Sequence, residues 1–115
     1  MIFGIFQPQI PGVTADEVYD AIEKNEKIHI IDVRTPEEFA KCRINKSVNV
    51  PVNKVVRIIQ NVIPNKKAII YVYCLSGSRS VVAVDTMIKL GYTQVYNMQS
   101  GLLAWRAKKY PHISS

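Results

Sequence analysis

The sequence predicts an α/β fold with three layers, in which a central, mainly parallel sheet of about five strands lies between two layers of helices. Two observations carry this prediction. Residues 28–33 and 68–73 are nearly all apolar and rich in β-branched side chains, as expected for strands that are covered on both faces. Segments with a helical spacing of apolar residues alternate with these strands along the chain. Such an alternation places a ligand site at the carboxyl ends of the strands.

The 115 residues are expected to form a single domain. Within it, residues 1–9 are assigned to an N-terminal arm or edge strand and residues 110–115 to a tail. The apolar opening of the chain lacks a basic leader and a small-residue cleavage site, so the expected location is the cytoplasm. The sequence contains no apolar run long enough to span a membrane, and membrane association is not expected.

The first helix is expected to begin at a capping box. Thr14 and Glu17 have the spacing at which each side chain can bond the backbone amide of the other residue. Val13 and Val18 are placed to pack on each other as a hydrophobic staple. The helix is then expected to run to about Asn25, before the first buried strand.

A second capping box follows that strand. Thr35 and Glu38 repeat the pattern, with Pro36 at the first helical position, so a short helix is expected to start at once. Asp32 and Arg34, which precede this helix, therefore lie at the carboxyl end of a strand.

Three more helices and a strand at residues 93–96 are expected in the second half of the chain. Gly91 is expected to cap the second of these helices, and the last helix is expected at residues 102–108. The residues predicted to form the apolar faces of the three helices are Val55, Val56 and Ile59, then Val81, Val84 and Ile88, and finally Leu102, Leu103 and Trp105. Trp105 is interpreted as core packing and not as a substrate contact.

One short segment of the chain indicates chemistry. Cys74 follows the apolar strand at residues 68–73 and precedes a small-residue loop that turns into a helix. A cysteine at this position receives backbone N–H groups and the positive end of the helix dipole, and both favour the reactive thiolate. Cys74 is therefore predicted to be a nucleophile. The alternative is a buried core thiol, since free cysteine is among the most buried residue types.

The loop after Cys74 has the composition of an anion-binding cradle. Gly77 can adopt positive φ, and the serines are small enough for successive amides to turn inward. Arg79 supplies a fork of donors, which can either grip the oxygens of an anion or hold loop carbonyls. The predicted binding residues for an anionic substrate are Leu75, Ser76, Gly77, Ser78, Arg79 and Ser80.

Four segments stand out as a series: IDVRTPEEF at 31–39, SVNVP at 47–51, YCLSGSRS at 73–80 and NMQSGLLAW at 97–105. In this order and spacing they resemble the signatures of single-domain rhodaneses, whose members carry sulfur as a persulfide on a loop cysteine. The resemblance covers nearly the whole chain. Three departures are visible: Cys42 and Arg43 replace a usual Gly-His pair, Ser100 replaces the first glycine of a pair, and Leu75 replaces a basic or polar residue.

The resemblance implies a sulfurtransferase that moves sulfane sulfur from a small anionic donor such as thiosulfate through a persulfide on Cys74. The implied acceptor is cyanide in the test tube and a thiol or a protein in the cell. No cofactor is expected, and the covalent persulfide sulfur on Cys74 is an intermediate. Four residues separate Cys74 from Arg79, whereas the related dual-specificity phosphatases have five between the matching cysteine and arginine. The shorter loop resembles that of the sulfurtransferases. Leu75 removes a positive charge from the loop entrance, which makes a doubly charged donor such as thiosulfate a less secure substrate. An alternative function with the same fold and loop is a non-turnover persulfide carrier or protein-binding module loaded by a partner enzyme.

Asp32, Arg34 and Glu38 are expected to be structural, as the matching positions mainly are in the family. Arg34 is predicted to pair with Glu38 across the start of the short helix. The alternative role for Asp32, as a carboxylate at a strand end, is to accept a proton or to orient the catalytic loop. His29 falls inside a strand and His112 in the tail, so a Cys-His dyad is not expected.

The remaining polar features suggest few further roles. Cys42 is either a resolving thiol or a packed residue, and its spacing from Cys74 fits neither a metal site nor a disulfide framework. The formal charge of +6 can attract small anions or an acidic partner, but it is spread along the chain without interleaved aromatics, so nucleic-acid binding is not expected. The expected assembly is a monomer or a weak dimer.

Overall fold

The computed structural model describes residues 9–115 and confirms the predicted α/β fold. Five strands form the central sheet in the order β1-β6-β5-β2-β4, and every neighbouring pair in it is parallel. The strands are β1 (Gly12–Val13), β2 (His29–Asp32), β4 (Val48–Asn49), β5 (Ile70–Tyr73) and β6 (Val95–Met98). Apart from Gln9, the segment assigned to an arm or edge strand lies outside the described residues.

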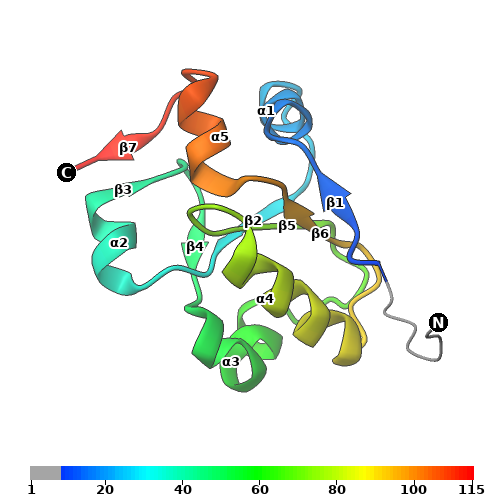
Figure 1. Ribbon diagram of the computed structural model, residues 1–115. Helices are drawn as coiled ribbons and strands as arrows, with labels where there is room; N and C mark the ends of the chain where they lie inside the picture. The colour runs from blue at the N-terminus through cyan, green and yellow to red at the C-terminus, as the bar shows by residue number, and fades with distance from the viewer. Residues whose placement is uncertain (1–8) are drawn as a thin grey trace, which may run out of the picture.

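Helices cover both faces of this sheet (Figure 1). Successive side chains on a strand point to opposite faces, so Ile31 and Val72 pack into one core cluster whereas Ile30 and Tyr73 pack into another. The first cluster lies under α3 and α4, and the second under α1 and α5. The helices are α1 (Ala15–Glu23), α2 (Pro36–Lys41), the 3₁₀-helix η1 (Val52–Lys54), α3 (Val55–Val62), α4 (Ser78–Lys89) and α5 (Gly101–Ala107).

Both predicted capping boxes are present. In α1, the Thr14 amide donates to Glu17 Oε1 over 2.9 Å and the Glu17 amide donates to Thr14 Oγ1 over 3.1 Å. In α2, the same bonds between Thr35 and Glu38 have the same lengths, 2.9 and 3.1 Å. These local bonds satisfy amides that a helix start leaves without partners, so both helices begin where the sequence indicates.

The predicted apolar faces of the later helices are partly wrong. In α3 and α5 the predicted faces contain two adjacent pairs, Val55 with Val56 and Leu102 with Leu103. Because neighbouring residues of a helix point about 100° apart, the second member of each pair turns away from the core. The exposed members of the predicted faces are Val56, Leu103, Ile88 and Val81, at 58%, 51%, 40% and 36%. The inner face of α4 is instead formed by Ser80, Ala83, Val84 and Met87. Trp105 is 1% exposed and lies in the core, as predicted.

Several element boundaries also differ from the prediction. The first helix ends at Glu23, two positions before Asn25, which takes a left-handed conformation with φ 56°. Strand β6 begins at Val95 and not at Thr93, and the Thr93 amide donates to the Lys66 carbonyl, in the segment that precedes β5. Gly91 caps α4 as expected, with φ 103°.

The C-terminal segment is more ordered than the predicted tail. Strand β7 (Ile113–Ser114) pairs antiparallel with β3 (Cys42–Arg43) in a second, two-stranded sheet. The Trp105 indole N–H also donates to the Pro111 carbonyl over 2.8 Å, which ties this segment to α5. Across residues 9–115, none of the helices has the length and apolar character needed to cross a membrane.

Candidate active site

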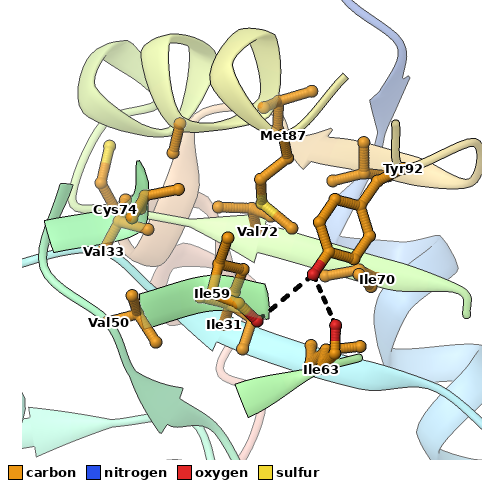
Figure 2. Packing of buried hydrophobic residues seen from close by; sticks show 14 residues of the cluster. Ile31, Val33, Val50, Ile59, Ile63, Ile70, Val72, Cys74, Met87 and Tyr92 are labelled. Atoms are coloured by element: carbon orange, nitrogen blue, oxygen red, sulfur yellow. Dashed lines mark hydrogen bonds between the residues drawn. The ribbon is translucent and has the colours of Figure 1, made fainter. Parts of the chain in front are cut away.

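Cys74 follows β5 directly and lies at the carboxyl end of the central parallel strands, as predicted. Its side chain is fully buried in the cluster under α4, where it shares the core with Val72 and Ala83. Figure 2 shows the Cys74 sulfur near Val33 and directed toward α4. The sulfur therefore lies at the base of the loop that joins β5 to α4.

Backbone amides surround the sulfur, as the sequence suggests. The Gly77 amide donates to Cys74 Sγ over 3.1 Å and the Ser80 amide over 3.4 Å. The Ser80 hydroxyl also lies 3.4 Å from the sulfur. These groups come from the loop and from the first turn of α4, so the start of this helix supplies the hydrogen-bond partners of the Cys74 sulfur.

Gly77 gives this loop its shape. It is the N-cap of α4 and has φ 108°, which confirms the expected left-handed conformation. A Cβ at this position would lie 3.2 Å from the backbone nitrogen of Ser100, so space is also short. In the described part of the chain, no side chain caps α4, and the free amides turn to Cys74 Sγ instead.

Two opposing effects determine the pKa of the thiol. Burial is the largest, and it raises the pKa of Cys74 because a buried charge loses its hydration. Hydrogen bonds from the Ser80 hydroxyl and from the amides of Ser80, Gly77 and Arg79 act in the other direction. Their sum prevails and holds the pKa of Cys74 below its ordinary value, so the site favours the nucleophilic thiolate.

A second helix start meets the same residue from the other side. The Leu102 amide donates to the Cys74 carbonyl over 2.9 Å, and the Leu103 amide donates to the Leu75 carbonyl over 3.0 Å. These amides belong to the first turn of α5, which has the left-handed N-cap Ser100 with φ 61°. The start of α5 therefore fixes the backbone of Cys74, while the start of α4 bonds its sulfur.

Gly101 makes this close approach possible, and the sequence analysis did not single it out. It has φ 51°, and a Cβ there would clash with the Cys74 carbonyl and lie 2.6 Å from the carbonyl oxygen of Leu75. The available signal was the glycine in the closing motif at residues 97–105, next to the unusual Ser100. Its role depends on contact with a distant loop, which spacing alone does not reveal.

Arg79 takes a role that the sequence analysis did not consider. Its guanidinium donates to Glu38 Oε1 over 2.7 Å and to Glu38 Oε2 over 3.1 Å, and both side chains are about one-third exposed, at 35% and 33%. The hydrogen bond from Arg79 is the main cause that lowers the pKa of Glu38 to about 2. Glu38 thus caps α2 and at the same time holds the arginine of the Cys74 loop.

The predicted Arg34 to Glu38 pair is wrong. Arg34 is buried and bonds Asp32, whose Oδ2 lies 2.6 Å from Arg34 Nη2. Arg34 also donates to the Cys42 carbonyl, and the Arg34 amide donates to Asp32 Oδ1 over 2.9 Å. The fork of the arginine matches the two carboxylate oxygens, and these bonds hold the turn between β2 and α2.

The remaining loop side chains face outward. Leu75 is 37% exposed, and Ser76 and Ser78 are exposed as well. Ser80 is completely buried, and its hydroxyl donates to Asn97 Oδ1 on β6. Asn97 is a functional candidate that sequence reasoning missed, because a single asparagine in a strand gives no sign of what lies across the sheet.

Cys42 and Cys74 are separated by the sheet. Cys42 lies in β3 and packs against the cluster under α1 and α5, whereas Cys74 belongs to the cluster under α4. The geometry therefore gives no support to Cys42 as a resolving thiol. Within the part of the chain that the structure describes, no group of three or more His, Cys, Asp or Glu side chains is placed to hold a metal ion.

Comparison with known proteins agrees with this arrangement. The sequence model of the family described as Rhodanese-like domain matches residues 14–108. A Bacillus subtilis protein named as a candidate sulfur carrier is 32% identical over 99 residues, which are 86% of this chain and 52% of that protein. The Escherichia coli thiosulfate sulfurtransferase PspE is 35% identical over 69 residues, which are 60% of this chain and 66% of that protein.

The fold comparison gives the same result. The crystal structure of a thiosulfate sulfurtransferase from Pseudomonas aeruginosa superposes with a TM-score of 0.85 at 20% identity, over 91% of this chain and 20% of that one. At this identity the likeness concerns the fold. The chain spans about half to two-thirds of the length of the two curated relatives, at 52% and 66%.

Proposed function

The chain belongs to the rhodanese-like domain family, and on this premise we propose that it is a sulfurtransferase that works through a persulfide on Cys74. It moves sulfane sulfur from a small anionic donor such as thiosulfate to a thiophilic acceptor. The observation that carries the proposal is the environment of Cys74 Sγ, which receives the amides of Gly77 and Ser80 at a helix start. Those donors stabilise negative charge at the sulfur before and after it accepts a second sulfur atom.

In the first half-reaction, the thiolate of Cys74 attacks the outer sulfur of thiosulfate. A new S–S bond forms to Cys74, the S–S bond within thiosulfate breaks, and sulfite leaves with the electron pair of that bond. The terminal sulfur of the persulfide carries one negative charge. Backbone amides of the loop and the field of α4 favour this anion, as they favour the thiolate.

In the second half-reaction, an acceptor nucleophile attacks the terminal sulfur. The S–S bond of the persulfide breaks, and its electron pair returns to Cys74 as thiolate. With cyanide, the product is thiocyanate; with a thiol, it is a persulfide of the acceptor. No cofactor other than the transferred sulfur is needed, and the thiolate is ready for another donor.

The small loop favours sulfur over phosphate. Four residues separate Cys74 from Arg79, and Arg79 bonds Glu38, which leaves the backbone amides as the anion donors nearest the sulfur. This supports a sulfurtransferase and argues against a phosphatase.

A second candidate function is a persulfide carrier that a partner enzyme loads. Leu75 stands at the mouth of the loop, is 37% exposed, and offers no positive charge to attract a free dianion. Under this alternative a protein persulfide donor loads Cys74 much faster than thiosulfate does. Measuring the rate at which Cys74 is loaded by thiosulfate and by a protein persulfide donor decides between a sulfurtransferase and a persulfide carrier.

We also propose a reducing compartment, with the cytoplasm as the expected location, because both cysteines are free thiols. A monomer or a weak dimer is expected, with a thiol or a protein as the sulfur acceptor. The scattered basic residues support neither nucleic-acid nor membrane partners.

Mass spectrometry of the intact protein tests the proposed function. After incubation with thiosulfate, the protein is expected to gain one sulfur atom, located on Cys74 by peptide analysis, and to lose it to cyanide. Cys74→Ser is expected to gain none while keeping its fold, and Cys42→Ser serves as the matched control that still gains sulfur. Cyanide-labile sulfur on the Cys74→Ser protein would overturn the mechanism.

A further inference from the structure

Two buried polar side chains form a hydrogen-bonded series that ends at the Cys74 sulfur. Ser80 Oγ lies 3.4 Å from Cys74 Sγ and donates to Asn97 Oδ1 over 2.5 Å. Ser80 is 0% exposed and Asn97 is 7% exposed, so water does not readily replace either partner. In the sheet Asn97 lies opposite Val72, whose side chain packs in the same cluster as Cys74.

The Ser80 hydroxyl has a single proton and two neighbours that can receive it. When Cys74 is a thiol, its S–H can donate to Ser80 Oγ while the Ser80 O–H donates to Asn97 Oδ1. The sulfur, the Ser80 hydroxyl and Asn97 Oδ1 then each have a partner. This is the arrangement in which Asn97 acts as the acceptor.

Loss of the thiol proton changes which hydrogen bonds the sulfur can make. The thiolate of Cys74 can only accept, so the Ser80 O–H is drawn toward the sulfur and away from Asn97 Oδ1. A buried carbonyl oxygen without a donor is costly, roughly 1–3 kcal/mol in proteins. The amide of Asn97 can avoid this cost by rotating, because its Nδ2–H₂ group can donate to Ser80 Oγ.

We propose that Asn97 is a positioning residue, whose amide turns over to set the direction of the Ser80 hydroxyl as Cys74 changes between thiol and anion. In one orientation Asn97 accepts from Ser80, and in the other it donates to Ser80 while Ser80 donates to sulfur. Ser80 keeps its own proton throughout, and only hydrogen bonds change. The buried sulfur can therefore lose its proton, or carry an anionic persulfide, without leaving a buried polar group unpaired.

An amide suits this position for a definite reason. An ionised carboxylate accepts but cannot donate, and an apolar side chain does neither, whereas asparagine presents an acceptor and a donor on one rotatable group. The charged groups near the sulfur come from other elements: Arg79 of α4, held by Glu38 of α2, and Asp32 at the end of β2. Strand β6 itself, Val95–Met98, contributes no charged side chain beside Asn97.

The proposal rests on the proposed function only in treating Cys74 as the reacting sulfur. Its test measures ionisation and not sulfur transfer, so the two can fail separately. A chain that takes up no sulfur from thiosulfate can still show the rotation, and a working sulfurtransferase can lack it.

The test follows the side-chain amide resonances of Asn97 by NMR across a pH titration. Cys42→Ser protein is used, so that the ultraviolet absorbance of the thiolate reports Cys74 alone. The Asn97 amide signals are expected to change with the same midpoint as the thiolate absorbance. Asn49 is the internal control: its Nδ2 group donates to the carbonyls of Asp32 and Arg34, over 3.0 and 2.9 Å, and its signals are expected to stay unchanged.

Ser80→Ala, made in the Cys42→Ser protein, removes the hydroxyl that connects Asn97 to the Cys74 sulfur. The ratio of Cys74 thiolate to thiol at a given pH is expected to fall by about threefold to tenfold, the loss typical of one hydrogen bond, and the Asn97 signals are expected to stop following the titration. If the Asn97 signals of the parent protein do not follow Cys74, or if they still follow it in Ser80→Ala, the proposal is wrong. The parent measurement needs no substitution near the sulfur, so a misfolded Ser80→Ala protein does not prevent a decision.

Discussion

The helices of this fold begin in two different ways. α1 and α2 are each closed by their own threonine and glutamate, whereas α4 and α5 begin with no side-chain cap from the described residues. At these two helices the free amides bond Cys74, at its sulfur in one case and at its carbonyl oxygen in the other. Since a helix start must find acceptors, the amides that no side chain caps in α4 and α5 are free to bond another partner. In α4 and α5 that partner is one cysteine, whereas α3, which also has no side-chain cap within residues 9–115, continues directly from the 3₁₀-helix η1.

Gly101→Ala tests the uncapped pair and has the largest expected effect. The added Cβ would collide with the Cys74 and Leu75 carbonyls, and alanine disfavours φ 51°. We expect a loss of about 3 kcal/mol or more in the free energy of unfolding, from overpacking and left-handed strain together. Displacement of Cys74 should also slow sulfur transfer by about 100-fold. Denaturant unfolding and the thiosulfate to cyanide assay measure the two effects.

Gly91→Ala is the matched control for that substitution. Gly91 has a similar left-handed φ of 103°, but the nearest atom to an added Cβ is Lys66 Nζ at 3.7 Å. Only the conformational strain, about 1–2 kcal/mol, is expected, with transfer unchanged when measured on folded protein. Equal losses of transfer in both variants would show that the contact of Gly101 with the Cys74 loop does not matter.

Glu38→Gln and Glu17→Gln test whether the two capped starts are equivalent. Glutamine can still close a capping box, so both variants keep their helix starts. Only Glu38 also bonds Arg79, at 2.7 and 3.1 Å. We expect Glu38→Gln to slow transfer by up to about fivefold, the factor that corresponds to roughly 1 kcal/mol for a partly exposed ion pair, and Glu17→Gln to leave it unchanged. A similar rate for both variants would mean that the ion pair has no part in holding the loop.

The same contrast explains what the sequence could reveal. The capping boxes join residues three positions apart, and the central strands β2 and β5 have a simple apolar pattern, so these features are confirmed, whereas the two-residue strands β1, β3, β4 and β7 give no such pattern. The loop around Cys74 was also predicted, because glycine and small residues are needed locally. The partner of Arg79 lies 41 positions away and the partner of Ser80 lies 17 away. Those contacts depend on how helices and strands pack, and no local spacing in the sequence predicts them.

Trp105, Val56 and Leu103 show the same limit within the core. The sequence identifies which segments are helical, but the packed face of a helix depends on how it rests on the sheet. Trp105 is buried as expected, whereas Val56 and Leu103 are exposed because an adjacent residue takes the inward position. Local patterns therefore locate elements, and tertiary packing decides which of their apolar residues are used.

The pH dependence of stability gives the smallest expected effect and concerns the ion pair of Glu38 with Arg79. The pKa of Glu38 is lowered from 4.5 to about 2 in the folded protein, chiefly by Arg79. The ionised form is thus favoured by folding, so its contribution is complete above pH 4.5 and is lost as the pH falls toward about 2. Because both partners are one-third exposed, solvent screening keeps this contribution below about 1 kcal/mol.

Glu38→Gln removes that titration without removing the capping box. We expect the free energy of unfolding of the parent protein to approach that of Glu38→Gln as the pH is lowered from 4.5 to 2, because protonated Glu38 resembles glutamine in charge. Denaturant unfolding of the two proteins over this range measures the difference. A difference that stays constant with pH would mean that the charge of Glu38 adds nothing to stability. The Arg79 bond would then serve to orient the Cys74 loop, as a hydrogen bond from Arg79 to the neutral amide oxygen of glutamine could also do.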